Sequence, residues 1–258
     1  MDEIEFAGLC QVPARCTLIH CGGGTLVVFS PLRMPQDKLT ALLVQLGVER
    51  VIVVAPNAMH HMFVHVFCDE LLPRSVTATI VASPALKRRF PERRWDRCLD
   101  VNATAPTQLT DDGGLLAFCV PGFGELDEVV LLHKPTRTLV CCDLAFNFSH
   151  EQCGRMPLIA RAYLWLFAST PVCVSWPFRF MIDAPKMLPC LAEIMRHDFD
   201  TLVMAHGAVV LGGAKAALRD GTVKFVDDLA RPVSTATKVA FAVAAIAPAA
   251  VGVRAWLR

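Results

Sequence analysis

The chain has 258 residues, of which 54% are hydrophobic and 19% are charged, and its formal net charge at pH 7 is +1. This length and apolar content suffice for one large buried core, and no compositional break divides the chain, so we expect a single domain over residues 1–258. A net charge so close to zero argues against a general polyanion binder, and we therefore expect no nucleic-acid partner.

The N-terminal residues and the cysteines bear on the cellular compartment. The first six residues, Met-Asp-Glu-Ile-Glu-Phe, are acidic and lack the basic region and apolar core of a secretory signal. The eleven cysteines include no Cys-x-x-Cys pair, and several lie inside apolar runs, which is typical of reduced thiols in a protein core. We therefore expect a cytoplasmic protein.

The first quarter of the chain predicts a β-β-α-β arrangement. Residues 16–20 and 25–30 flank three glycines, a pattern that is typical of an antiparallel hairpin. Residues 35–47 then carry leucines at helical spacing. The next strand, 51–55, consists of β-branched residues and alanine, which indicates burial on both faces of a sheet.

The end of that strand holds the first candidate site residues. Pro56 stops the strand, and Asn57 is a good N-cap for a helix whose first turn would contain His60 and His61. In open α/β sheets, ligands bind in the crevice beyond the carboxyl ends of the strands. The sequence therefore predicts that this histidine pair lies at a ligand site, although histidines near a helix start are also common as hydrogen-bonded structural residues.

The basic segment 87–97 contains six Lys or Arg residues, with Glu92 and Asp96 among them. Such a mixed run could bind nucleic acid, but a solvated helix and loop surface is the preferred interpretation.

Two later strands also end on polar residues. Residues 129–133 form an apolar run that ends at His133, a turn follows at 134–137, and the next run ends at Asp143. Further along, residues 199–205 predict a strand that leads directly into His206. The chain therefore repeats one pattern, an apolar strand that delivers a histidine or a carboxylate at its end.

Two segments lie outside this pattern. Residues 155–180 are rich in aromatic side chains, and we expect a helix and a loop that lean over the site. An apolar helical extension is expected over about 215–258, and its run of fifteen uncharged residues between Lys238 and Arg254 is shorter than the roughly 20 residues of a membrane span. A packing helix, a homodimer contact and a membrane-surface anchor remain open, in that order of preference.

Imidazole and carboxylate groups suit a divalent ion such as zinc, iron or manganese. The residues that end or follow strands supply five such groups, and the hypothesis is that some of them converge on one ion: His60, His61, His133, Asp143 and His206.

The order of these residues resembles that of the metallo-β-lactamase superfamily, whose ligands follow strands as His-x-His-x-Asp-His, then a histidine, a bridging aspartate and a last histidine. On this match His61 stands at the last histidine of the first motif and His60 at its aspartate, whereas Pro56 and Ala58 replace its first two histidines. The three later positions are matched, in order, by His133, Asp143 and His206.

A closer resemblance is to an uncharacterised branch of that superfamily, a domain of unknown function with a Pro-Asn-x-x-His-His motif. The motif is matched at residues 56–61, and the likeness covers about residues 15–215. The resemblance implies an α/β protein with a four-layer αββα sandwich.

The resemblance also implies a site and a function. It implies one divalent metal ion, zinc or else iron or manganese, in a mononuclear site, because two ligands of the other metal position are missing. The metal ligands would be His60, His61, Asp143 and His206. Asp143 and His133 would be the catalytic residues, with His133 as a proton carrier or substrate contact, and Asn57 would bind the substrate. The implied activity is hydrolysis of a small-molecule ester, thioester, amide or phosphoester, of unknown identity, by a metal-activated water.

The sequence also leaves two other interpretations open. In the first, the chain is a non-catalytic scaffold or binding protein of the same fold that holds no metal, so whether it is an enzyme stays open. In the second, His61 and His65 form the helical pair of a zinc protease, but Met62 occupies the place where that motif needs a glutamate base.

Overall fold

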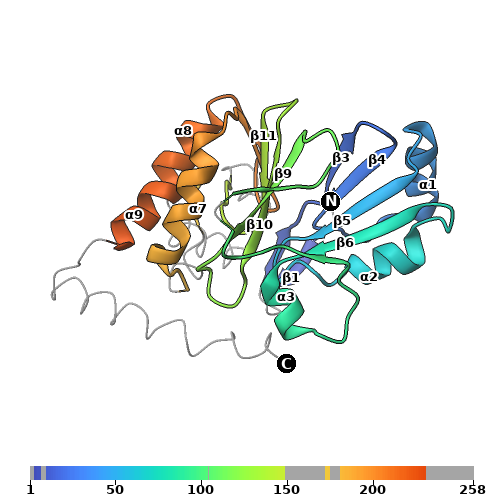
Figure 1. Ribbon diagram of the computed structural model, residues 1–258, viewed down its shortest axis with the longest axis horizontal. Helices are drawn as coiled ribbons and strands as arrows, with labels where there is room; N and C mark the ends of the chain where they lie inside the picture. Colours follow the sequence, from blue (N-terminus) through green and yellow to red (C-terminus); the bar gives the residue numbers. More distant parts are fainter. Residues whose placement is uncertain (1–2, 7–9, 104, 149–171, 175–180, 231–258) are drawn as a thin grey trace.

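The computed structural model describes residues 3–6, 10–103, 105–148, 172–174 and 181–230, and it consists of two sheets packed face to face between two layers of helices (Figure 1). One helix layer contains α1 (Gln36–Gln45), and the other contains α7 (Ala184–Arg196). This is the four-layer αββα sandwich that the resemblance implied. A separate hairpin, β1 (Glu3–Phe6) and β2 (Cys10–Pro13), precedes the sandwich.

The first sheet has five strands in the order β3-β4-β5-β6-β7. The β3–β4 pair is the predicted antiparallel hairpin, and the other three pairs are parallel. The carboxyl ends of β4, β5 and β6 therefore lie at one edge of this sheet. The strands are β3 (Thr17–Cys21), β4 (Thr25–Phe29), β5 (Arg50–Ala55), β6 (Thr77–Ala82) and β7 (Arg97–Cys98).

The second sheet has six strands in the order β13-β12-β11-β10-β9-β8. Only β11 and β12 are parallel neighbours, whereas β10 runs antiparallel to both β9 and β11. The edge that holds the carboxyl ends of β11 and β12 thus holds the amino end of β10. The strands are β8 (Thr107–Gln108), β9 (Leu115–Val120), β10 (Glu128–His133), β11 (Thr138–Cys141), β12 (Thr201–Met204) and β13 (Val210–Leu211).

Apolar residues fill the spaces on both sides of the second sheet, as β10 illustrates. Val129 and Leu131 join the cluster between the two sheets, while Val130 and Leu132 join the cluster that contains Met187 of α7. Successive strand residues point to opposite faces, so a strand buried on both faces is apolar throughout. The apolar content of the sequence is therefore explained by these two core layers.

The segment after β5 differs from the prediction. No helix begins near Asn57; residues 58–63 are turns and bends, and the helix α2 (Val64–Val66) continues into a π-helical turn, η1 (Phe67–Leu71). The Asn57 side chain still acts as a cap, because Oδ1 accepts the backbone N–H groups of Met59 and His60 at 2.9 and 3.1 Å. A helical segment thus follows β5 as predicted, but it begins at Val64, later than the start that an N-cap at Asn57 implied.

Three short helical elements follow β13 and continue the outer layer with α7. Their buried side chains include Leu218 and Val226. Part of the predicted C-terminal extension thus packs on the sandwich, while residues 231–258 and most of the aromatic segment 155–180 lie outside the described residues. The elements are α8 (Ala214–Leu218), η2 (Arg219–Val223) and α9 (Lys224–Ala230).

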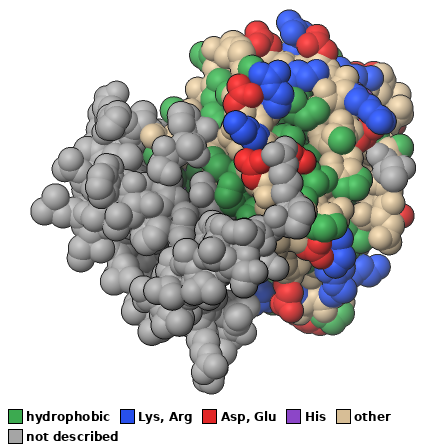
Figure 2. All heavy atoms as spheres, turned by 90° about the vertical axis from the view of Figure 1, so that its left-hand side faces the viewer, with side chains coloured by type: hydrophobic (Ala, Val, Ile, Leu, Met, Phe, Trp, Pro, Cys, Tyr) green, Lys and Arg blue, Asp and Glu red, His purple; other side chains and the backbone are tan. Residues whose placement is uncertain are grey.

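The described part of the face formed by α7, α8 and α9 carries acidic and basic side chains interspersed with apolar ones (Figure 2), in keeping with the net charge of +1. Among the described helices, we found none with both the length and the hydropathy needed to cross a membrane.

Candidate metal centre

His60, Asp143 and His206 meet at the shared edge of the two sheets. Each residue follows a strand, β5, β11 or β12, and each is buried, with 8, 2 and 6% of its surface exposed. The two Nε2 atoms are 3.1 Å apart. The Asp143 oxygens lie 3.6 Å from each of them, Oδ2 from His60 and Oδ1 from His206. The sequence prediction of convergence is thus met by three of the five candidate residues.

The spacing of these atoms fits a metal ion. Ligands at about 2.0–2.1 Å from a tetrahedral zinc ion are separated from each other by about 3.3 Å, close to the 3.1 and 3.6 Å found here. Two imidazoles and one carboxylate also form a donor set that is common for zinc, iron and manganese. Among the described residues, this is the group of three whose ligand atoms lie close enough to share an ion.

A buried hydroxyl group orients His60. Ser30, directly after β4, places Oγ 3.0 Å from His60 Nδ1, and this leaves Nε2 directed at the cluster. Such contacts hold a metal-binding imidazole in one orientation and one tautomer. The contact between Ser30 and His60 joins the ends of two parallel strands, so the sequence alone did not indicate this role for Ser30.

Asp143 is oriented by Asn57. The Asn57 Nδ2 atom donates to Asp143 Oδ2 at 2.7 Å, while its Oδ1 holds the turn that carries His60. Asn57 is fully buried, with 0% of its surface exposed. Both ends of this amide are used inside the protein, where it positions the cluster, and its contact with a substrate stays a prediction.

Glu128 supports the loop that carries Asp143. Its carboxylate accepts the backbone N–H groups of Cys142, Asp143 and Leu144 at 2.8, 2.7 and 3.2 Å. Glu128 was not among the predicted site residues. The available signal was an acidic residue at the start of an otherwise apolar strand, because a carboxylate buried there needs hydrogen-bond donors nearby.

The loop of His206 is fixed from two sides. Arg15 donates hydrogen bonds to the carbonyl oxygens of Met204 and Gly207. Gly207 has a φ of +98°, and a Cβ atom there would lie 2.3 Å from the Asn147 carbonyl oxygen, so only glycine fits. The ring of Phe146 stacks on the His206 imidazole, with 5.3 Å between the centroids and 4° between the planes.

Burial dominates the electrostatics of the cluster. It lowers the pKa of His60 to about 4, against the opposing effect of the Asp143 carboxylate, so His60 is neutral at pH 7. Burial, with the Asp143 charge second, raises the pKa of Glu128 to about 8, although three backbone N–H groups act in the other direction. A neutral imidazole is the form that binds a metal ion.

His61 lies outside the group of three, contrary to the expected ligand role. Its ring packs on Phe90, with 4.6 Å between the centroids, and its buried Nδ1 atom makes no well-aligned hydrogen bond. Burial and then the charge of Arg93 lower its pKa to about 4, and the nearby Ala58 carbonyl opposes them only in part. Because residues 58–63 form turns, adjacent side chains here point in different directions.

His133 does not approach the cluster, so the structure does not bring it together with the other candidate residues. It pairs with Thr138 at the start of β11, and Asp143 lies five residues further along the chain, about 16 Å at the rise of a strand. The antiparallel turn reverses the chain, and thus the end of β10 and the end of β11 lie at opposite edges. At its own edge His133 contacts Thr136, with 2.8 Å between Nδ1 and Oγ1.

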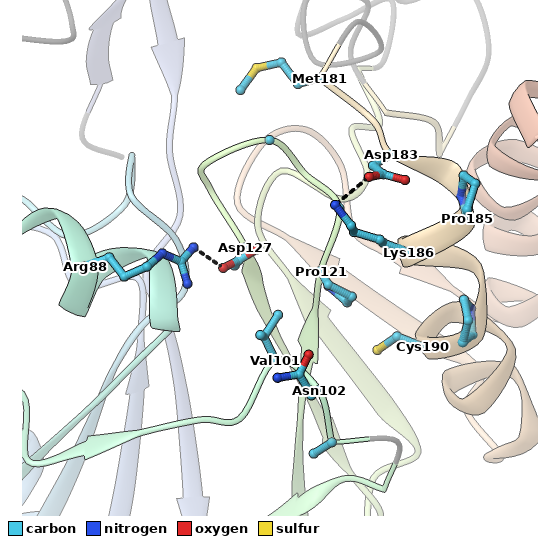
Figure 3. A pocket seen from close by; sticks show the side chains of 14 residues that line it. Arg88, Val101, Asn102, Pro121, Asp127, Met181, Asp183, Pro185, Lys186 and Cys190 are labelled. Atoms are coloured by element: carbon cyan, nitrogen blue, oxygen red, sulfur yellow. Dashed lines mark hydrogen bonds and ion pairs between the residues drawn. The ribbon is translucent and has the colours of Figure 1, made fainter.

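A separate cavity of about 610 Å³ lies between the loop that joins β9 to β10, helix α7 and the helix α3 (Pro84–Arg89) (Figure 3). Its charged groups pair with each other: Arg88 Nη2 is 2.9 Å from Asp127, and Lys186 Nζ is 2.8 Å from Asp183. The lining does not include His60, Asp143 or His206. This cavity is therefore distinct from the candidate metal centre.

The fold is similar to that of solved metallo-β-lactamases. The DIM-1 metallo-β-lactamase matches with a TM-score of 0.55 and 11% identity over 85% of this chain and 89% of that one. The FIM-1 enzyme from Pseudomonas aeruginosa, in its mono-zinc form, matches with a TM-score of 0.54 and 12% identity over 89% and 90%. The metal-soaked Flv1 flavodiiron core from Synechocystis sp. PCC6803 matches with a TM-score of 0.52 and 15% identity over 84% and 53%.

Identities this low establish the fold alone, and at that level the resemblance to the metallo-β-lactamase superfamily is confirmed. Neither a family model nor a curated protein sequence matches the chain. The branch with the Pro-Asn-x-x-His-His motif therefore stays a prediction.

Proposed function

We propose that this chain of metallo-β-lactamase fold is a metal-dependent hydrolase with a mononuclear site whose protein ligands are His60, Asp143 and His206. The observation that carries the proposal is the set of distances between their ligand atoms, 3.1, 3.6 and 3.6 Å, in a buried site. Catalytic zinc sites commonly use three protein ligands and keep a position for water. A mono-zinc form of one structural neighbour supports the idea that the fold can hold a single ion.

When bound, a divalent cation would lower the pKa of a water molecule and polarise the carbonyl or phosphoryl oxygen of a substrate. Other residues of the chain hold the ligands in the orientation that this chemistry needs. Ser30 fixes the ring of His60, and Asn57 fixes the carboxylate of Asp143. Burial of the ligands keeps solvent from competing for them and strengthens electrostatic interactions. The substrate would be a small-molecule ester, thioester, amide or phosphoester.

The test is the metal content of untagged chain, purified without chelator and measured by mass spectrometry. We expect about one equivalent of zinc, iron or manganese, lost in His206→Ala and in Asp143→Ala. The matched control is His133→Ala, which removes a histidine from the opposite edge of the sheet and should keep the metal. Circular dichroism checks that each variant is folded.

Activity is tested on the same samples with p-nitrophenyl acetate and bis-p-nitrophenyl phosphate. Hydrolysis that needs the metal and disappears in His206→Ala would support the enzyme. A wild-type chain that is purified without metal and fails to take up added zinc, iron or manganese would overturn the proposal.

The second candidate is a scaffold or binding protein without metal, and one observation favours it. The Nε2 atoms of His60 and His206 are 3.1 Å apart, a distance at which one imidazole can donate directly to the other. A hydrogen-bonded pair of this kind would satisfy the buried rings without an ion. The metal measurement separates the two candidates.

The cytoplasmic location and the homodimer remain predictions.

A further inference from the structure

Two arginine side chains lie on the ring of Phe90, which packs against His61, the neighbour of His60 in the chain. Phe90 follows α3 at the carboxyl end of β6 and contacts the His61 ring. The guanidinium of Arg93 lies 4.5 Å from the centroid of the Phe90 ring, and that of Arg89 lies 5.6 Å from it. His61 adjoins His60 in the chain, so these cations lie beside the segment that carries His60.

A third arginine reaches the same segment from another strand. Arg33 follows β4, and its guanidinium lies 5.7 Å from the ring centroid of Phe63, two residues after His61. The parallel pairing of β4, β5 and β6 places the ends of all three strands at one edge. Positive charge from two loops therefore gathers at the edge that holds the cluster.

Arg93 differs from other exposed arginines. Arg50, Arg94 and Arg137 each hold a carboxylate oxygen at 2.8 Å. Arg93 Nε instead lies 3.9 Å from the Glu92 carboxylate, beyond hydrogen-bond distance, and it is exposed. A guanidinium that rests on a ring keeps its N–H groups available in the plane, where they can hold a planar or tetrahedral anion.

We infer that Arg93, with Arg33, binds an anionic group of the substrate, a carboxylate or a phosphate, while the bond to be hydrolysed lies at the His60–Asp143–His206 cluster. The position of the hydrolysed bond at the cluster rests on the proposed function. The anion subsite itself stands on the arginine and aromatic contacts, so it can be tested without the metal.

The first test is calorimetric titration of metal-free chain with inorganic phosphate and, separately, with succinate at low ionic strength. We expect binding of one or both, weakened about tenfold in Arg93→Gln, the size expected for loss of a charged hydrogen bond, and less in Arg33→Gln. The matched control is Arg74→Gln, an exposed arginine that precedes β6 at the opposite edge of the sheet; it should change affinity less than twofold. The preferred anion identifies the group.

Absence of binding to both probes, or equal weakening in Arg93→Gln and Arg74→Gln, would overturn the subsite. Arginine-dependent binding by a chain that takes up no metal would instead leave the subsite standing and overturn the proposed function. The two failures are therefore distinguishable.

The second test uses metal-loaded chain and two esters that differ in charge, p-nitrophenyl acetate and mono-p-nitrophenyl succinate. In both, water adds to the acyl carbon and the bond to p-nitrophenolate breaks, so the chemistry is matched. Arg93→Gln should lower kcat/KM at least fivefold for the anionic ester and less than twofold for the neutral one, at unchanged metal content. Equal losses for the two esters would contradict recognition of the anion.

Discussion

A histidine and a hydroxyl group are in contact at each end of the sandwich, and among the described residues only one end also brings together a group that could hold an ion. At the carboxyl end of β11, the Ser30–His60 pair is buried, and Asp143 and His206 lie within reach. At the opposite edge, His133 and Thr136 make an equally short contact, 2.8 Å, but solvent reaches both residues. A histidine in contact with a hydroxyl group therefore does not by itself indicate a metal centre. The indication also requires a buried carboxylate and a second histidine close to the same imidazole.

The largest expected effect comes from the buried carboxylate that supports the first edge. Glu128→Ala would leave three buried backbone N–H groups without an acceptor, at about 1–3 kcal/mol each. We expect the free energy of unfolding to fall by about 3 kcal/mol or more, measured by denaturant titration of metal-free chain. Asp112→Ala is the control at the other edge, where an exposed carboxylate accepts the Gly114 N–H group, and it should change stability little. A stable Glu128→Ala variant would contradict this account of the loop.

A smaller effect is expected from the two hydroxyl groups, which give a matched pair of variants. Ser30→Ala removes the partner of His60 Nδ1, and loss of such a contact behind a metal ligand weakens metal binding about 10–100-fold. Thr136→Ala removes the partner of His133 Nδ1 and should leave the affinity unchanged. Competition with a chelating dye measures both. Equal affinities in the two variants would mean that Ser30 does not orient a ligand.

The smallest expected effect separates two neighbouring histidines. His61→Phe keeps a ring against Phe90 and removes the buried Nδ1 atom, whose interaction with the Ala58 carbonyl is weak. We expect metal affinity within twofold of wild type and no loss of stability, since a poorly paired buried polar atom is unfavourable. A metal affinity reduced a hundredfold would return His61 to the ligand set implied by the family resemblance.

Much of the fold could be predicted from the sequence, because apolar strands and glycine turns are local patterns. The rule that strand ends deliver polar groups also found His60, Asp143 and His206. It failed for His133 because it ignored strand direction: the turn at 134–137 already implied that β10 and β11 run in opposite directions. It failed for His61 because the side-chain directions in a turn depend on φ and ψ angles that the sequence does not display.

The supporting residues were harder to foresee. Glu128 and Ser30 act through contacts with residues 15 and 30 positions away in the chain. Such contacts arise only when strands pair and sheets pack, and no local pattern marks them. The network that joins the carboxylates of Glu128 and Asp143 to the amide of Asn57 is therefore apparent only in the folded chain.

The most direct test of the central claim is X-ray diffraction from crystals of zinc-loaded chain, recorded on both sides of the zinc absorption edge. The account predicts one anomalous peak, about 2.0–2.2 Å from Nε2 of His60, Nε2 of His206 and a carboxylate oxygen of Asp143. A peak at His61 or His133 with none at the cluster, or no peak in zinc-soaked crystals, would contradict it.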